Sequence, residues 1–265
     1  MSILYAWVVP AYADGSPVDH TWVTTYDSRV HPYPDIAAVK AAGERNWYCW
    51  GSFHPKGGAP GHADGYIGSQ SGDLNIADCL VAPNLSSSGN PPAQGTIFTY
   101  GVDGVCHQLA NQVLYSTGGA GSSPLTVKRA RGYALSSFIY GTYGLQHTAW
   151  QKKIAACTGK RLPLNVTDGA GPMADLPDDF EQLAREALGD RTEALSKLLS
   201  LRAQVQAFAM QTMPGFLPPD PDYLNARNQQ LIDQAAALLG PDDFRKLFGI
   251  APGEKVNLVD PKVER

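Results

Sequence analysis

The chain has 265 residues, of which 43% are hydrophobic and 17% are charged, and its formal net charge at pH 7 is -4. A chain of this length and composition can fold around its own core, which excludes disorder throughout. Its negative charge and its lack of a long basic run exclude the positive surface that a nucleic-acid partner requires.

The amino terminus, MSILYAWVVPAYADG, has no basic start, and a proline and an aspartate follow its brief apolar run. This pattern is typical neither of a secretory leader nor of a membrane span. We therefore expect a cytoplasmic protein that has no membrane partner.

Residues 1–165 combine short strand-like runs with loops rich in glycine, proline and serine. The runs that predict strands are ILYAWVV, HTWVTTYD, NWYCWGSF, GYIGS and GTIFTYGV. A short helix, PDIAAVKAAGE, is predicted between the second and third runs. The loops FHPKGGAPGHADG and APNLSSSGNPPAQG are typical either of surface loops around a site or of plain connections.

The strand HTWVTTYD carries the first candidate site residue, because alternation places His20 among bulky aromatic side chains that shield it from water. The residues that share this face are His20, Trp22, Thr24 and Tyr26. Asn46, at the start of the run RNWYCWGSFH, can hold one ring nitrogen of His20 and leave the other to face a thiol. His20 is therefore a candidate general base, with a purely structural histidine as the alternative.

The four cysteines are irregularly spaced, which predicts free thiols rather than a disulfide framework. They are Cys49, Cys79, Cys106 and Cys157. A metal site built from Cys49, His54 and His62 would match no structural zinc spacing. We expect no metal and no cofactor.

The segment VDGVCHQLANQVL predicts a helix with Asp103 as its cap and Cys106 in its first turn. Its apolar face carries Cys106, Leu109, Ala110, Val113 and Leu114. Its other face carries His107, Gln108, Asn111 and Gln112. The helix start favours a thiolate at Cys106, whereas the charge of Asp103 opposes one. Two interpretations stay open: an activated nucleophile, or the first buried residue of an amphipathic helix.

Downstream, the basic run VKRARG contains Lys128, Arg129 and Arg131, which form either a solvated patch or a site for an acidic substrate. Near residue 172 the composition changes, and leucine and alanine recur at helical spacing. We expect a catalytic domain at 1–165, a helical extension at 172–250, and a tail at 251–265 that lies as a strand or stays loose. For the helices of this extension three roles stay open: they could cover a cleft, dock a protein partner or form a homo-oligomer.

Several of these segments resemble a known family. VDHTWVTTYD, followed by NWYCWGS and ADGYIGSQSG, resembles the second half of the papain-like cysteine peptidases, and GVCHQLANQVL resembles their nucleophile helix. The order is reversed, as in the circularly permuted branch that includes NlpC-like permuted peptidases and lecithin:retinol acyltransferase-like proteins. The chain departs from the papain pattern because no C-G-S-C-W string surrounds Cys106 and the loop after Trp50 is long.

The resemblance implies an α+β fold: a permuted papain-like domain with an antiparallel sheet and a nucleophile helix, followed by a helical subdomain. It implies Cys106 as nucleophile, His20 as base and Asn46 as orienter, with His54 as an alternative orienter and Gln94 as an oxyanion donor. The predicted activity is that of a cysteine peptidase or amidase that forms a thioester with a peptide or small amide. The alternatives are an acyl or amide transferase with the same triad, and a catalytically silent binding or scaffold protein.

Overall fold

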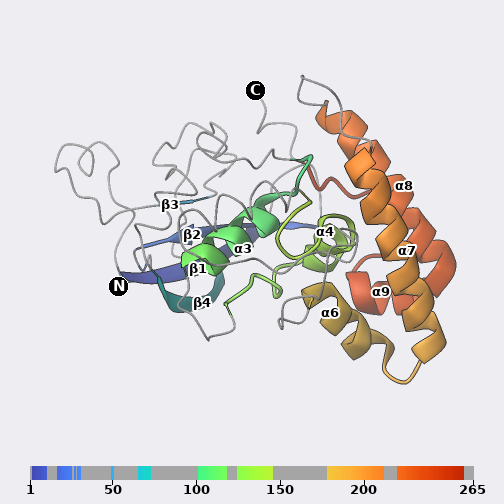
Figure 1. The fold of residues 1–265 in the computed structure, drawn as a ribbon, viewed down its shortest axis with the longest axis horizontal. Coiled ribbons are helices and arrows are strands. Elements are labelled where there is room, and N and C mark those ends of the chain that lie inside the picture. Colours follow the sequence, from blue (N-terminus) through green and yellow to red (C-terminus); the bar gives the residue numbers. More distant parts are fainter. Residues whose placement is uncertain are drawn as a thin grey trace.

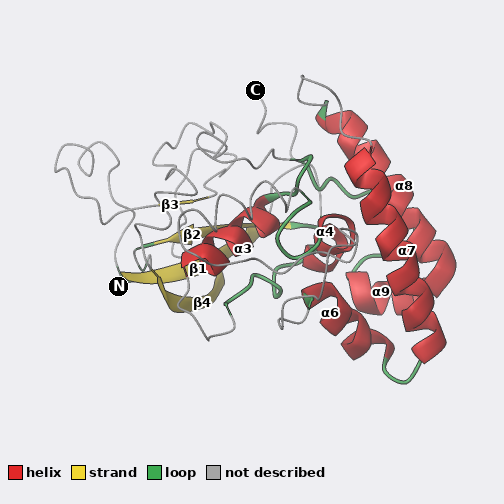
Figure 2. Cartoon of the chain, viewed as in Figure 1, coloured by secondary structure: helices red, strands yellow, loops and turns green. Residues whose placement is uncertain are grey.

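The fold is taken from a computed structural model that describes residues 2–10, 17–25, 27, 29–30, 49–50, 65–72, 101–117, 124–145, 178–211 and 220–259. Within these ranges an antiparallel sheet comes first along the chain and helices follow it (Figures 1 and 2). The predicted α+β class is confirmed at this coarse level. None of the helices in these ranges is both long enough and apolar enough to cross a membrane.

The sheet has four strands in the order β3-β2-β1-β4. They are β1 (Ser2–Pro10), β2 (Asp19–Thr24), β3 (Cys49–Trp50) and β4 (Gly65–Gly72). All three pairings are antiparallel, and Trp7 of β1 lies opposite Trp22 of β2. Four of the predicted strand runs thus contain observed strands. Most of the fifth, GTIFTYGV, lies outside the described residues, as does the predicted helix PDIAAVKAAGE.

The two faces of the sheet differ because successive side chains of a strand point in opposite directions. One face carries Leu4 and Ala6 of β1 with Val23 of β2, which belong to the main core. The other face carries the separate Trp7 and Trp22 cluster, where the indole nitrogen of Trp7 donates to Thr24 Oγ1 at 2.7 Å. Which face a residue of β2 occupies therefore decides which part of the molecule it can reach.

Helix α3 (Cys106–Thr117) packs on the Leu4 face of the sheet, against β2 above all. It begins at Cys106, so Val105 holds the N-cap position, and the predicted cap Asp103 lies two residues earlier. The backbone N–H of Val105 donates to Oε1 of Gln108 at 3.1 Å, which is half of a capping box. The residues predicted on its non-apolar face are also buried, and they are His107, Gln108, Asn111 and Gln112.

Helix α4 (Tyr133–Tyr140) is not among the predicted elements. All of its residues except Ala134 are buried, so its sequence has no polar stripe that would reveal a helical period. The helices predicted after residue 172 are present as α6 (Asp179–Leu188), α7 (Thr192–Gln211), α8 (Pro221–Leu239) and α9 (Pro241–Phe248). Asp178 caps α6 by accepting from the N–H of Glu181.

A single hydrophobic core runs from Leu4 of β1 to Val259 near the carboxyl end. Aromatic rings of α4, α6 and α9 meet in it through Phe138, Phe180 and Phe248. Val256, Leu258 and Val259 of the predicted tail also belong to it, and none of residues 251–259 pairs as a strand. Asn225 of α8 holds Val259 with two hydrogen bonds: its Nδ2 donates to the carbonyl at 2.7 Å, and its Oδ1 accepts from the N–H at 2.9 Å.

Asn225→Ala tests whether the tail is part of the core. The substitution leaves the buried N–H and C=O of Val259 without partners, so we expect the free energy of unfolding to fall by about 2 kcal/mol. Urea unfolding followed by circular dichroism measures the change. Gln230→Ala, an exposed position on the same helix, is the control and should change stability by less than about 0.5 kcal/mol. Equal effects of the two substitutions would contradict a packed tail.

Candidate functional site

The predicted nucleophile lies where α3 meets the first residues of β2. Cys106 is 5% exposed, and its Sγ lies 3.9 Å from the carbonyl oxygen of Asp19, the residue immediately before His20. The structure therefore brings together the two chain segments that carry Cys106 and His20.

The side chain of His20 lies on the face of β2 that points away from α3 and Cys106. Thr21 shares a face of β2 with Val23, which belongs to the main core, and it thus lies on the α3 side near the thiol of Cys106. His20 and Trp22 alternate with Thr21, and their rings stack on the opposite side at a centroid distance of 5.6 Å. The ring of His20 is therefore directed away from Cys106, and it is buried, with an exposed fraction of 6%.

The surroundings of Cys106 favour the neutral thiol. Burial raises the pKa of Cys106 to about 11, although the nearby polar groups of Thr21 and of the backbone of residues 106 and 107 act in the opposite direction. The start of α3 therefore stabilises the thiolate less than loss of water destabilises it. At neutral pH the Cys106 side chain in this geometry is protonated.

His107, which follows Cys106 directly, is held at both ring nitrogens. Nε2 lies 3.0 Å from the carbonyl oxygen of Asp19, and Nδ1 lies 2.8 Å from Oγ of Ser136. A carbonyl only accepts, so Nε2 carries the proton and Nδ1 accepts from the Ser136 hydroxyl. Burial lowers the pKa of His107 to about 4, so the ring is neutral at pH 7 and fastens α3 to β2 and α4.

Asp19 is itself fixed by Arg131, a member of the predicted basic patch. The carboxylate accepts from Nε of Arg131 at 2.9 Å and from its backbone N–H at 2.8 Å, while the N–H of Asp19 donates to the Arg131 carbonyl at 3.0 Å. Lys128 binds Gln182 at 2.9 Å. Two of the three basic side chains thus make specific internal contacts, and Arg131 acts on the residue that joins β2 to α3.

The second face of α3 holds the loop after α4. Nε2 of Gln108 donates to the Gly141 carbonyl at 3.0 Å, and Nδ2 of Asn111 donates to the Thr142 carbonyl at 2.9 Å. Gln112 reaches the next carbonyl along this loop. This role was not predicted, because the sequence shows only a polar helix face and not whether that face binds loop carbonyls or water.

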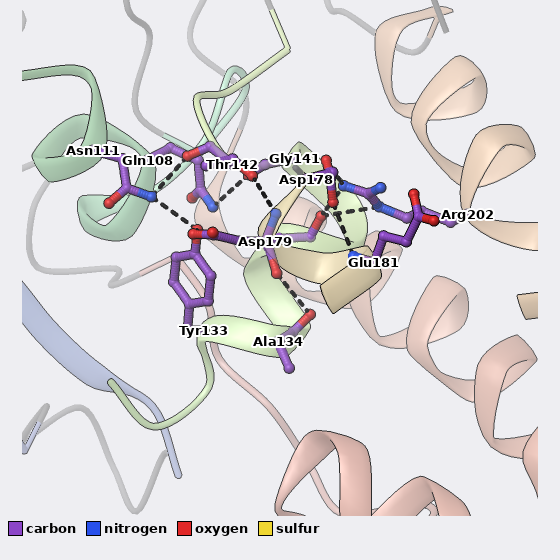
Figure 3. A network of polar contacts seen from close by, with 11 residues as sticks. Gln108, Asn111, Tyr133, Ala134, Gly141, Thr142, Asp178, Asp179, Glu181 and Arg202 are labelled. Carbon is purple, nitrogen blue, oxygen red and sulfur yellow. Dashed lines mark hydrogen bonds and ion pairs between the residues drawn. The ribbon is translucent and has the colours of Figure 1, made fainter. Parts of the chain in front are cut away.

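The network continues from α3 into the carboxyl-terminal helices (Figure 3). Asn111 also donates to the Tyr133 hydroxyl at 2.9 Å, and that hydroxyl donates to Oδ2 of Asp179 at 2.7 Å. The neighbouring carboxylate, Asp178, pairs with Arg202 of α7 at 2.9 Å. Helix α3 is thereby fixed to α4, α6 and α7 through buried polar groups as well as through apolar contacts.

The other predicted site residues, Asn46, His54 and Gln94, lie outside the described residues, as do Cys79 and Cys157. Cys49 lies in β3. In the ranges that the structure covers, no group of three or more His, Cys, Asp or Glu side chains is arranged to hold a metal ion.

The chain matches no protein-family model, no curated protein and no solved structure. The resemblance to permuted papain-like peptidases therefore remains a prediction from the sequence. What the site does has to be inferred from its own residues and their geometry.

His107 makes a testable contribution to stability at acid pH. Its pKa is lowered from about 6.5 in the unfolded chain to about 4 in the fold, so the unfolded state binds the proton more tightly. The contribution of the neutral ring is complete above pH 6.5 and declines as the pH falls toward 4. Between pH 7 and pH 5 we expect this group to lower the free energy of unfolding by about 2 kcal/mol.

Urea unfolding of the wild type and of His107→Gln at pH 7 and pH 5 isolates this effect, because other groups titrate equally in both proteins. The wild type should lose more stability than the variant over this interval. The same loss in both proteins would contradict a buried neutral His107.

The hold of Arg131 on Asp19 gives a second test. Arg131→Ala removes a hydrogen bond and the Arg131 charge from the Asp19 carboxylate, whose side chain is 10% exposed. We expect the free energy of unfolding to fall by about 2 kcal/mol, because hydrogen bonds to charged groups are the stronger class. Arg129→Ala, an exposed neighbour, is the matched control and should change stability by less than about 0.5 kcal/mol. Thermal and urea unfolding measure the stability of both variants. An unchanged stability of Arg131→Ala would contradict the stabilising contact between Arg131 and Asp19.

Proposed function

We propose that this chain is a cysteine-dependent peptidase or amidase, with Cys106 as the nucleophile and His20 as the general base. The observation that carries the proposal is the meeting of the two segments, with Sγ of Cys106 at 3.9 Å from the carbonyl oxygen of the residue before His20. The position of Cys106 as the first residue of α3 adds to it, because the free amides of a helix start can hold an oxyanion.

In the proposed reaction His20 takes the proton of Cys106, and the thiolate attacks the carbonyl carbon of an amide. The C–N bond breaks, the amine leaves with the proton, and an acyl thioester remains on Cys106. Water then releases the acid, which is hydrolysis. An acceptor amine would take the acyl group instead, which is the transferase alternative.

The geometry defines what this reaction requires. The His20 ring has to reach the face of β2 on which Thr21 meets the thiol, so residues 18–20 have to turn about the start of the strand. Without the imidazole, the raised pKa of Cys106 leaves less than one thiol in a thousand ionised at neutral pH, by order of magnitude.

A second candidate, a catalytically silent binding protein, is favoured by two specific observations. Cys106 belongs to the continuous hydrophobic core, and His107, the imidazole next to it in sequence, has both nitrogens engaged. In this function the thiol is a packing residue, and the fold presents its surface to a partner.

Alkylation of Cys106 distinguishes the two functions. Native protein is treated with iodoacetamide between pH 5 and pH 11, and the modification of each cysteine is followed by peptide mass. As a peptidase, the wild type should show a Cys106 rate that is already level near neutral pH, because an imidazole supplies the base, and His20→Ala should lower that rate at least tenfold. The denatured chain gives the intrinsic rate of each thiol.

The silent protein gives a different profile. The Cys106 rate then rises about tenfold per pH unit until the pH reaches about 11, as the raised pKa requires, and His20→Ala leaves it unchanged. That outcome overturns the peptidase proposal and leaves the binding function.

A further inference from the structure

Arg227 of α8 is a buried cation whose charge no described carboxylate neutralises by direct contact. Its side chain is 5% exposed, and among the described residues it forms no ion pair. Nε and Nη2 donate to Oδ1 of Asn228 at 3.3 and 2.9 Å, and Nη2 also lies 3.3 Å from the Tyr140 hydroxyl. Nη1 is buried and, within the described part of the chain, has no hydrogen-bond partner.

A second buried donor, Nε2 of Gln206 on α7, likewise lacks a hydrogen-bond partner in the ranges that the structure covers. Gln206 is 1% exposed and follows Arg202 by one helical turn, so the two side chains lie on the same face of α7. Arg202 donates to the Ser137 carbonyl of α4 at 3.1 Å, which directs this face of α7 toward α4.

Both unsatisfied donors therefore belong to helices that contact α4. Arg227 reaches Tyr140, the last residue of α4, and Gln206 lies one turn beyond the contact with Ser137. Helices α7 and α8 pack against each other and each contacts α4 (Figure 1). The donors thus come from two neighbouring helices that both contact a third.

Two buried donors without an acceptor, one of them on a cation, are costly in a protein interior. Burial raises the pKa of the Tyr140 hydroxyl, the charge of Arg227 lowers it, and the charge of Asp103 raises it by a smaller amount. No ion pair joins Asp103 to Arg227, and Nη1 of the guanidinium has no partner in the described part of the chain. An oxygen that is negatively charged satisfies both the donors and the charge.

We propose that α4, α7 and α8 enclose a binding site for a small oxyanion, held through carboxylate or phosphate oxygens by Nη1 of Arg227 and Nε2 of Gln206. The site is independent of the proposed peptidase reaction. The Tyr140 hydroxyl, which Arg227 and Asn228 contact, donates to the Gly101 carbonyl at 2.8 Å. A bound oxyanion therefore fastens α8 to α4 and to the turn that precedes α3.

Thermal unfolding of the full chain tests the site with sodium phosphate, sodium sulfate and sodium acetate, each compared with sodium chloride at equal ionic strength. The Tm of the wild type should rise by about 3 °C for each tenfold increase in the binding oxyanion above its Kd. A rise in Tm with phosphate and sulfate but not with acetate would identify a phosphate-type ligand. A rise in Tm with acetate alone would identify a carboxylate ligand. A wild type that responds to none of them beyond chloride overturns the proposal and leaves a buried water as the partner.

Arg227→Met should abolish the rise, and Gln206→Leu should weaken it by shifting the response to at least tenfold higher concentrations. Gln206→Leu keeps the test open if Arg227→Met does not fold, because it removes no charge. The matched control is Arg245→Met, which removes an exposed arginine of α9 and should keep the full wild-type response. An undiminished response in Arg227→Met or in Gln206→Leu would place the oxyanion elsewhere.

Discussion

The carbonyl oxygen of Asp19 is the point at which the sheet and the central helix are joined. It accepts from Nε2 of His107 and lies 3.9 Å from Sγ of Cys106, so the first two residues of α3 both contact it. Arg131 holds the carboxylate and the N–H of the same residue. Because this oxygen sits at the start of β2, it fixes which side chains of the strand face α3.

Helix α3 is stabilised differently on its two sides, and that difference explains why the main core joins the sheet to the carboxyl-terminal helices. Apolar residues hold it to the sheet, whereas Gln108 and Asn111 hold it to the loop after α4 through buried hydrogen bonds. The same network reaches Asp179 and Arg202 in the carboxyl-terminal helices. These helices therefore contribute to the position of Cys106, and they share the main core with the sheet.

The sequence was informative wherever a local pattern determines structure, and uninformative where contacts between distant segments do. Period-two alternation located β2, and amphipathic spacing placed Cys106 in the first turn of α3, although the helix begins later than the predicted cap Asp103 implied. The burial of Asn111 could not be predicted, because a polar helix face that binds loop carbonyls has the same composition as one that faces water. The partnership of Arg131 with Asp19, and the choice of Thr21 over His20 on the α3 face, depend on how separate elements dock.

Disulfide trapping with Cys106 measures most directly which side of β2 faces α3. Thr21→Cys and His20→Cys are compared under the same mild oxidant, with the intramolecular disulfide read by peptide mass. The contacts at Asp19 and Thr21 predict that Thr21→Cys forms the bond with Cys106 readily and that His20→Cys does not. The opposite result, a bond from His20→Cys alone, would contradict the arrangement of β2 on α3 described above.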